Sequence, residues 1–231
     1  MDFILEGLVT AVRLLAGLDP ETFSAVWATL AVSGLSLTAT LLLGIPLGFA
    51  LGYFQFPGKR VVRTLVETSL SLPTVVIGLV VYAFLSRRGP LGDLGLLFTV
   101  SGMAIGLTIL GLPIVLAITA TAVEGLEERL RFTLLTLGAN KRQVALASLW
   151  EARFAVLLGA ITAFGRIVSE VGIAMMVGGN IKWHTRTITT AVALETNKGE
   201  FGQGIALGCV LMVIALVVNL AAGFFRRRAK P

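Results

Sequence analysis

The segment LGLLFTVSGMAIGLTILGLPIVLAITATAV, from Leu94 to Val123, decides the fold class of this chain because it contains no charged residue. A helix needs about 20 apolar residues to cross the roughly 30 Å hydrocarbon core of a bilayer, and this segment exceeds that length. Three further uncharged segments are also long enough to form a span: Thr22–Gly58, Thr68–Ser86 and Phe201–Phe225. The pattern predicts an all-α integral membrane protein.

The overall composition leads to the same prediction. Of the 231 residues, 56% are hydrophobic and only 14% are charged, against about a quarter charged in an ordinary soluble domain. This composition excludes a soluble globular domain, and the abundance of Leu, Val and Ile excludes disorder. A single cysteine, Cys209, excludes a disulfide scaffold. No polar domain is present to turn the net charge of +6 into a binding groove, so we expect no nucleic-acid partner.

A fifth apolar segment, Phe154–Gly179, is interrupted only by Arg166 and Glu170. Charged residues are costly inside a membrane, but residues four apart on a helix meet on one face and can pair. We therefore interpret Arg166 and Glu170 as an intramembrane ion pair. Such a pair could brace the helix, or Arg166 could attract an anion within the membrane, and the sequence leaves both roles open.

Five transmembrane helices follow from these segments, in one transmembrane domain over residues 23–225. The expected spans are about 27–54, 65–86, 94–123, 154–177 and 201–225. Residues 1–22 are expected to form an N-terminal interfacial helix and a turn, because Asp2, Glu6, Thr10 and Arg13 recur on one helix face. Asp2 and Glu6 stand where a signal peptide has its basic region, so we expect no cleaved signal.

The distribution of Lys and Arg predicts the orientation, since cytoplasmic loops are enriched in these residues. Most of the 19 Lys and Arg residues lie in loops on one side of the five spans, and residues 226–231 form a basic tail on that side. We expect this side to be cytoplasmic, with the C-terminus there and the N-terminus outside. The residues on this side are Lys59, Arg60, Arg63, Arg129, Arg131, Lys141, Arg142, Arg153, Arg226, Arg227, Arg228 and Lys230.

Proline and glycine mark special positions within the spans. Pro73 and Pro113 free carbonyl groups that lipid cannot satisfy, so each should face protein or a water-filled cavity. We expect both prolines to lie on a translocation path or gate, with the hydroxyl of Thr74 available to a passing solute; a fixed kink is the alternative. The repeated glycines of the first span, such as Gly44 and Gly48, predict close helix packing within the bundle or at a homodimer interface.

The longest segment on the cytoplasmic side, residues 124–153, has amphipathic helical sequence broken at Gly138 and Ala139. Two short helices at an angle are expected. Lys141, Arg142 and Gln143 follow Asn140 at the exposed start of the second helix, where a protein partner could bind. A solvated surface loop is the alternative.

Enzymatic chemistry is not indicated. The sequence has no glycine-rich phosphate loop. It has one histidine, His184, and no Ser-His-Asp set or close carboxylate cluster. We therefore expect no catalytic residue, no metal site and no cofactor bound by this chain.

The segment from Glu124 to Trp150 resembles the cytoplasmic signature of the permeases of ABC importers, centred on the Gly138–Ala139 break. This chain has Phe132-Thr133-Leu134 where the family signature has Glu-Ala-Ala, and Leu149-Trp150 where it has Leu-Pro. A second segment, Ala163–Gly208, is similar to the branch that imports molybdate, tungstate and sulfate, and its part from Thr189 to Phe201 most resembles tungstate permeases.

The resemblance implies a type I ABC importer permease in a bacterial or archaeal plasma membrane. Two copies of the chain would form one path, and two separate ATPase subunits, which bind ATP and magnesium, would dock on the segment around Gly138. An extracytoplasmic oxyanion-binding protein would deliver tungstate; molybdate and sulfate remain alternatives. A carrier or channel that works without ATP is the alternative from another functional class, although no internal repeat is visible.

Overall fold

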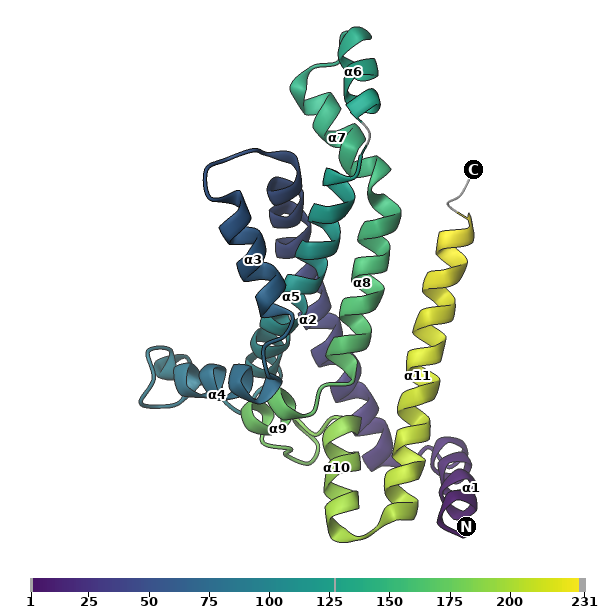
Figure 1. The fold of residues 1–231 in the computed structure, drawn as a ribbon. Coiled ribbons are helices and arrows are strands. Elements are labelled where there is room, and N and C mark those ends of the chain that lie inside the picture. Colours follow the sequence, from purple (N-terminus) through teal and green to yellow (C-terminus); the bar gives the residue numbers. More distant parts are fainter. Residues whose placement is uncertain (1, 127, 229–231) are drawn as a thin grey trace.

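The computed structural model describes residues 2–126 and 128–228, and every regular element in these ranges is helical (Figure 1). The helices are α1 (Asp2–Ala16), α2 (Pro20–Tyr53), α3 (Lys59–Ser69), α4 (Thr74–Leu85), a short 3-10 turn η1 (Gly92–Leu94), α5 (Val100–Glu124), α6 (Glu128–Thr136), α7 (Lys141–Glu151), α8 (Arg153–Val168), α9 (Gly172–Gly178), α10 (Ile188–Lys198) and α11 (Phe201–Arg228).

The central pair of the bundle is α2 and α5, which pack closely along their length because α2 presents glycines to α5. A Cβ added at Gly48 would lie 2.7 Å from the carbonyl oxygen of Leu116, and one at Gly52 would lie 2.6 Å from that of Ala120. The glycines of the first span therefore serve packing within the chain. Asp19 caps the start of α2, where its carboxylate accepts a hydrogen bond from the Thr22 amide.

Within the described ranges, α2, α5 and the Phe201–Leu220 part of α11 are long and apolar enough to cross a membrane. Two bent helix pairs raise the number to up to five if each pair counts as one span. The second expected span, 65–86, is not one helix. It divides into α3 and α4, whose axes differ by 100°, because α3 ends at Ser69 and Pro73 is the N-cap of α4.

The expected span 154–177 is also interrupted. Helix α8 ends at Val168, and the short helix α9 starts at Gly172. Glu170 therefore lies in the connection between the two helices and not on the same helix as Arg166. At its other end α8 continues from α7 with a bend of 53°.

A buried apolar cluster joins five of these helices. It contains Val32 of α2, Ile77 and Val81 of α4, Met103 and Leu107 of α5, and Ile167 of α8. Ile173 and Val177 place α9 in the same cluster. The start of α4 and the start of α9 are thus held by the core of the molecule.

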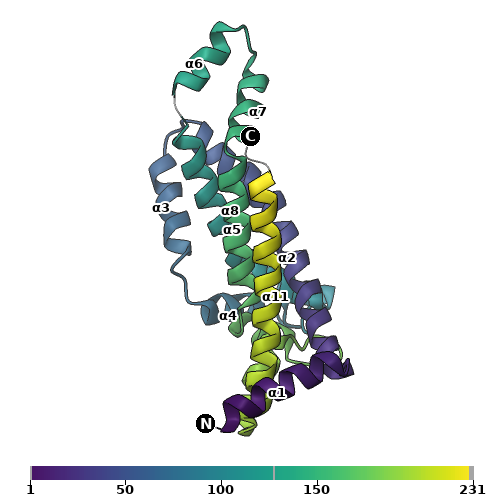
Figure 2. The ribbon, with the colours of Figure 1, turned by 90° about the vertical axis from the view of Figure 1, so that its right-hand side faces the viewer.

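The two ends of the bundle differ in their elements. Helices α6 and α7 project from one end, where α11 also ends, and α1 and the α10–α11 connection lie at the other (Figure 1). Helix α1 runs across α11 (Figure 2), where an added Cβ at Gly7 would lie 2.6 Å from Ile205. The position of α1 at a membrane surface stays a prediction, and residues 229–231 of the expected basic tail lie outside the described part of the chain.

Candidate functional site

The start of α4 meets the α8–α9 connection at Gly172. A Cβ added at Gly172 would lie 3.2 Å from Oε1 of Glu170 and 3.5 Å from Oγ1 of Thr74. Pro73 is exposed and Thr74 is half-buried. The structure therefore brings together Thr74 and Glu170, which the sequence assigned separately to a path and to an ion pair.

Glu170 is buried, and its carboxylate and main-chain carbonyl oxygen accept three hydrogen bonds. Its Oε2 accepts a hydrogen bond of 2.8 Å from the guanidinium of Arg166, and its Oε1 accepts one of 3.3 Å from the Ile173 amide. The Thr189 hydroxyl donates to the Glu170 carbonyl oxygen at 3.1 Å. The Glu170 side chain is 4% exposed and that of Arg166 is 41% exposed. Glu170 thus joins α8, α9 and α10, while part of the Arg166 guanidinium remains exposed.

Buried threonine hydroxyls surround this connection. Oγ1 of Thr187 lies 2.9 Å from Oγ1 of Thr189, and the Ile188 amide donates to Oγ1 of Thr29 on α2 at 2.9 Å. The sequence analysis used Thr189 only as the start of the segment that resembles tungstate permeases. The hydrogen bonds of these threonines attach the start of α10 to α2 and to the α8–α9 connection.

Pro113 has a different environment from Pro73. It lies inside α5 and is buried within the single chain. The structure therefore does not bring Pro113 to the surface where Pro73 and Thr74 lie.

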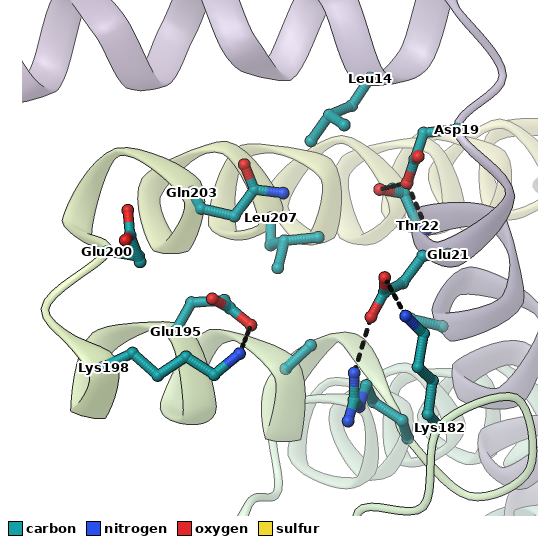
Figure 3. Close-up of a pocket in the computed structure, with 13 residues that line it drawn as sticks. Leu14, Asp19, Glu21, Thr22, Lys182, Glu195, Lys198, Glu200, Gln203 and Leu207 are labelled. Carbon is teal, nitrogen blue, oxygen red and sulfur yellow. Dashed lines mark hydrogen bonds and ion pairs between the residues drawn. The ribbon is translucent and has the colours of Figure 1, made fainter.

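A charged cavity of about 580 Å³ lies at the end of the bundle that contains α1 (Figure 3). Oε1 of Glu21 accepts a hydrogen bond of 2.7 Å from Arg186, and Oε2 lies 2.7 Å from Nζ of Lys182. Two cations share one carboxylate, which ties the start of α2 to the loop before α10. Beside them, hydrogen bonds from the Thr22 hydroxyl and amide hold the pKa of the Asp19 carboxyl below its ordinary value.

Sequence reasoning missed this cavity and a second charged group at the opposite end. There Glu124 pairs with Lys59 at 3.0 Å and also with Arg63. Each group joins residues that are far apart in the chain, so helical spacing gives no signal for either one. Lys59 and Arg63 were recognised only as markers of orientation.

The segment around Gly138 forms two short helices, as expected. Gly138 has a φ of +85°, a backbone conformation that favours glycine, and the chain turns there between α6 and α7. Asn140 and Gln143 form a capping box at the start of α7. Lys141 and Arg142 follow the cap and are exposed.

Large apolar side chains are exposed on the same projection. Leu137 is 78% exposed, Leu146 is 68% exposed and Trp150 is 69% exposed. Exposed apolar residues beside exposed cations are typical of a surface that contacts another protein. Among the described residues, no group of three or more His, Cys, Asp or Glu side chains could hold a metal ion.

Comparison with known proteins identifies the family of this chain. Residues 44–231 match the model of the family described as binding-protein-dependent transport system inner membrane component. The chain is 46% identical to the tungstate uptake system permease protein TupB of Campylobacter jejuni, over 98% of this chain and 95% of the relative. It is 37% identical to the tungstate uptake system permease protein TupB of Peptoclostridium acidaminophilum, over 95% of this chain and 96% of the relative.

A solved structure shares the fold. A bacterial ABC transporter involved in the import of the acidic polysaccharide alginate contains a chain that superposes with a TM-score of 0.77 at 20% identity, covering 95% of this chain and 84% of the other. The all-helical fold is thus that of an ABC importer permease. From the extent of these matches, the chain belongs to the family of binding-protein-dependent transport system inner membrane components, the multi-pass permease subunits of ABC importers.

Proposed function

We propose that this chain is the permease of a tungstate importer and forms the translocation path as a homodimer. The observation that carries the proposal is the 46% identity, over nearly the whole chain, to a permease named for tungstate uptake. The all-helical fold supports it. The chain is a transport subunit and not an enzyme, so ATP hydrolysis belongs to a separate subunit that holds ATP and magnesium.

The α6–α7 projection is the docking site for that ATPase in this proposal. It stands away from the bundle (Figure 1) and exposes Lys141, Arg142 and large apolar side chains. The capping box of Asn140 and Gln143 fixes the first turn of α7, so the backbone of Lys141 and Arg142 is held in place. Gly138 and Ala139 supply the turn that presents both helices.

The path itself passes the α4–α9 contact. Pro73 and Thr74 begin α4 at an accessible position, and the Arg166–Glu170 pair lies across Gly172 from Thr74. Pro113, which is buried, would act on the path through the shape of α5. In this arrangement the ion pair braces the gate, and part of the Arg166 guanidinium stays exposed.

The proposed orientation puts α6, α7 and the C-terminus in the cytoplasm and α1 outside. The bent pair α3–α4 then counts as one crossing beside α2, α5, α8 and α11, which gives five crossings in all. The end with Glu21, Lys182 and Arg186 faces the extracytoplasmic binding protein that delivers the oxyanion. The exposed apolar residues of α1, such as Leu5 and Val9, suit a helix in the membrane interface.

Transport by the reconstituted complex tests the substrate. The permease, its ATPase and its binding protein would be placed in proteoliposomes, and uptake of tungstate, molybdate and sulfate would be measured with and without ATP. We expect ATP-dependent uptake of tungstate, with the other two anions transported less efficiently. Preferred uptake of molybdate or sulfate would refute the tungstate assignment, and uptake without ATP would favour the ATP-independent carrier.

The docking site is tested by a charge reversal in α7. Arg142→Glu should release the ATPase from the complex, as measured by native mass spectrometry. Arg88→Glu is the matched control, because Arg88 is also exposed but lies in the loop after α4, away from the α6–α7 projection. Equal ATPase retention in both variants would contradict docking at α7.

A further inference from the structure

An apolar groove of about 450 Å³ lies where α2 ends, between α2, α3 and α5. Its lining side chains are uncharged, and several are far from buried: Leu47 is 50% exposed and Phe54 is 55% exposed. At the end of a membrane span such a groove is next to lipid, and its open apolar lining can hold an acyl chain. The residues that define the groove are Leu47, Leu51, Phe54, Phe56, Val62 and Leu116.

Two basic cavities adjoin the groove because they share lining residues with it. One, of about 490 Å³, shares Phe56 and is also lined by Lys59, Arg60 and Arg63. The other, of about 530 Å³, shares Phe54 and is lined by the cations at the start of α7. The groove is therefore apolar along α2 and strongly basic at its mouth.

The charges at this mouth do not cancel. Glu124 pairs with Lys59 and Arg63, and Glu67 pairs with Arg63 at 3.0 Å, so two carboxylates offset these two cations. Arg60 is exposed and forms no ion pair with any side chain that the structure describes. The mouth thus keeps a net positive charge, which would attract an anionic group.

The depth of the groove matches the position of a lipid. The connection from α2 to α3 lies at the end of the bundle from which α6 and α7 project (Figure 1), the proposed cytoplasmic side. From Leu47 to Phe54, at 1.5 Å per residue, the groove extends about 10 Å from this end toward the middle of the bundle. A headgroup at the basic mouth would place its acyl chain along the groove.

We propose that this groove binds one anionic phospholipid of the cytoplasmic leaflet, with the phosphate at Arg60 and an acyl chain against Leu47 and Val62. Charge favours this occupant over a second copy of the chain, because a second copy would bring the same basic mouth against this one. The inference rests on the proposed orientation and is independent of the transported anion.

Native mass spectrometry of the purified complex tests the site. Phosphatidylglycerol and phosphatidylcholine of the same acyl length would be added in equal amounts, and the lipids retained per permease copy would be counted. We expect one phosphatidylglycerol per copy, with phosphatidylcholine retained at least about fivefold less, since each cation near an anionic headgroup contributes about 1 kcal/mol.

Matched variants separate the headgroup from the groove. Arg60→Gln should lower phosphatidylglycerol retention about fivefold, Arg60→Lys should restore it, and Arg88→Gln at the other end should leave it unchanged. Ala50→Phe, which fills the groove, should lower retention of both lipids. The same spectra report the ATPase subunits, so a complex without ATPase would refute the proposed function while leaving the lipid count readable.

Four results would overturn the assignment. Equal retention of the two lipids would remove the role of charge, and equal effects of Arg60→Gln and Arg88→Gln would remove the role of Arg60. Binding of inorganic phosphate without lipid would make the mouth a site for a soluble anion. The fourth result is a complex that retains no lipid and whose groove is protected from a membrane-soluble label only in the dimer. The groove would then be an interface between two copies of the chain.

Discussion

Replacement of Arg166 by alanine tests whether the ion pair braces the α8–α9 connection. The change leaves the carboxylate of Glu170, whose side chain is 4% exposed, with only the Ile173 amide as a side-chain partner at 3.3 Å. Loss of one partner of a fully buried pair costs about 3–5 kcal/mol. Because the Arg166 side chain is 41% exposed, water replaces part of the interaction, and we expect a loss of about 2 kcal/mol.

The thermal unfolding midpoint of the purified complex measures this loss. For a chain of this size, about 2 kcal/mol corresponds to a decrease of roughly 4–8 °C. The double variant Arg166→Ala/Glu170→Gln should recover at least half of the decrease, because it removes the unpaired buried charge and keeps an oxygen for the Ile173 amide. Lys198→Ala is the control: it breaks the Lys198–Glu195 pair, whose cation is 52% exposed, and should change the midpoint by about 2 °C or less.

Two outcomes would refute the bracing argument. An unchanged midpoint in Arg166→Ala together with lost oxyanion uptake would mean that Arg166 contacts the anion. A double variant as unstable as the single variant would mean that the unpaired charge of Glu170 is not the source of the loss.

Three further predictions concern packing, the docking helix and pH. Gly48→Ala should lower the free energy of unfolding by about 1–3 kcal/mol, because its Cβ would lie 2.7 Å from the α5 backbone. Gly34→Ala on the same helix is the control: its Cβ would have no atom within 4 Å, so stability should rise by up to about 1 kcal/mol. Equal unfolding midpoints of the two variants would contradict this packing. Asn140→Ala removes the capping box of α7 and should speed hydrogen exchange in the first turn of α7 about fivefold, since a cap contributes about 1 kcal/mol; unchanged exchange would show that the cap is unimportant. The lowered pKa of Asp19 stabilises the fold above the ordinary value of 3.8, and this contribution is lost as the pH falls through the lower folded pKa. The difference in unfolding midpoint between the native chain and Asp19→Asn should therefore be constant above about pH 5 and shrink at lower pH; a difference that grows on acidification would contradict the hydrogen bonds to Thr22.

The long helices could be predicted from the sequence because their signal is local. The uncharged segment that ends at Val123 forms α5, and the one that starts at Phe201 begins α11. The break at Gly138 was also predicted, since a glycine in amphipathic helical sequence marks a turn. Each of these features depends on residues that are close together in the chain.

The bends and the charged groups could not be predicted in the same way. An apolar segment with one proline fits a kinked span, and only packing of α4 on α9 decides that the chain turns by 100° before Thr74. The pairing of Glu21 with Arg186 joins residues 165 positions apart. Hydropathy and helical spacing carry no information on such contacts, so the connection of Glu170 to Thr74 through Gly172 emerged only from the structure.

Helix α8 connects the proposed docking helix to this contact without a loop. Ala152 is both the C-cap of α7 and the N-cap of α8. The guanidinium of Arg153 lies 4.9 Å from the ring centre of Trp150 and 4.5 Å from that of Phe154, and it donates a hydrogen bond to the Trp150 carbonyl oxygen at 2.7 Å. The 53° bend between the helices is therefore held by several contacts rather than left free to move.

A rigid connection has a consequence for the proposed transport cycle. A flexible loop after α7 would absorb the movement of an ATPase, whereas α8 carries it over about 24 Å, the length of its 16 residues. The helix ends beside Glu170, whose carboxylate accepts a hydrogen bond from the Ile173 amide of α9. Movement of α7 would thus reach the contact between α9 and Thr74 through the Arg166–Glu170 pair, which explains why a brace is needed at the end of α8 even though charge is costly within a membrane.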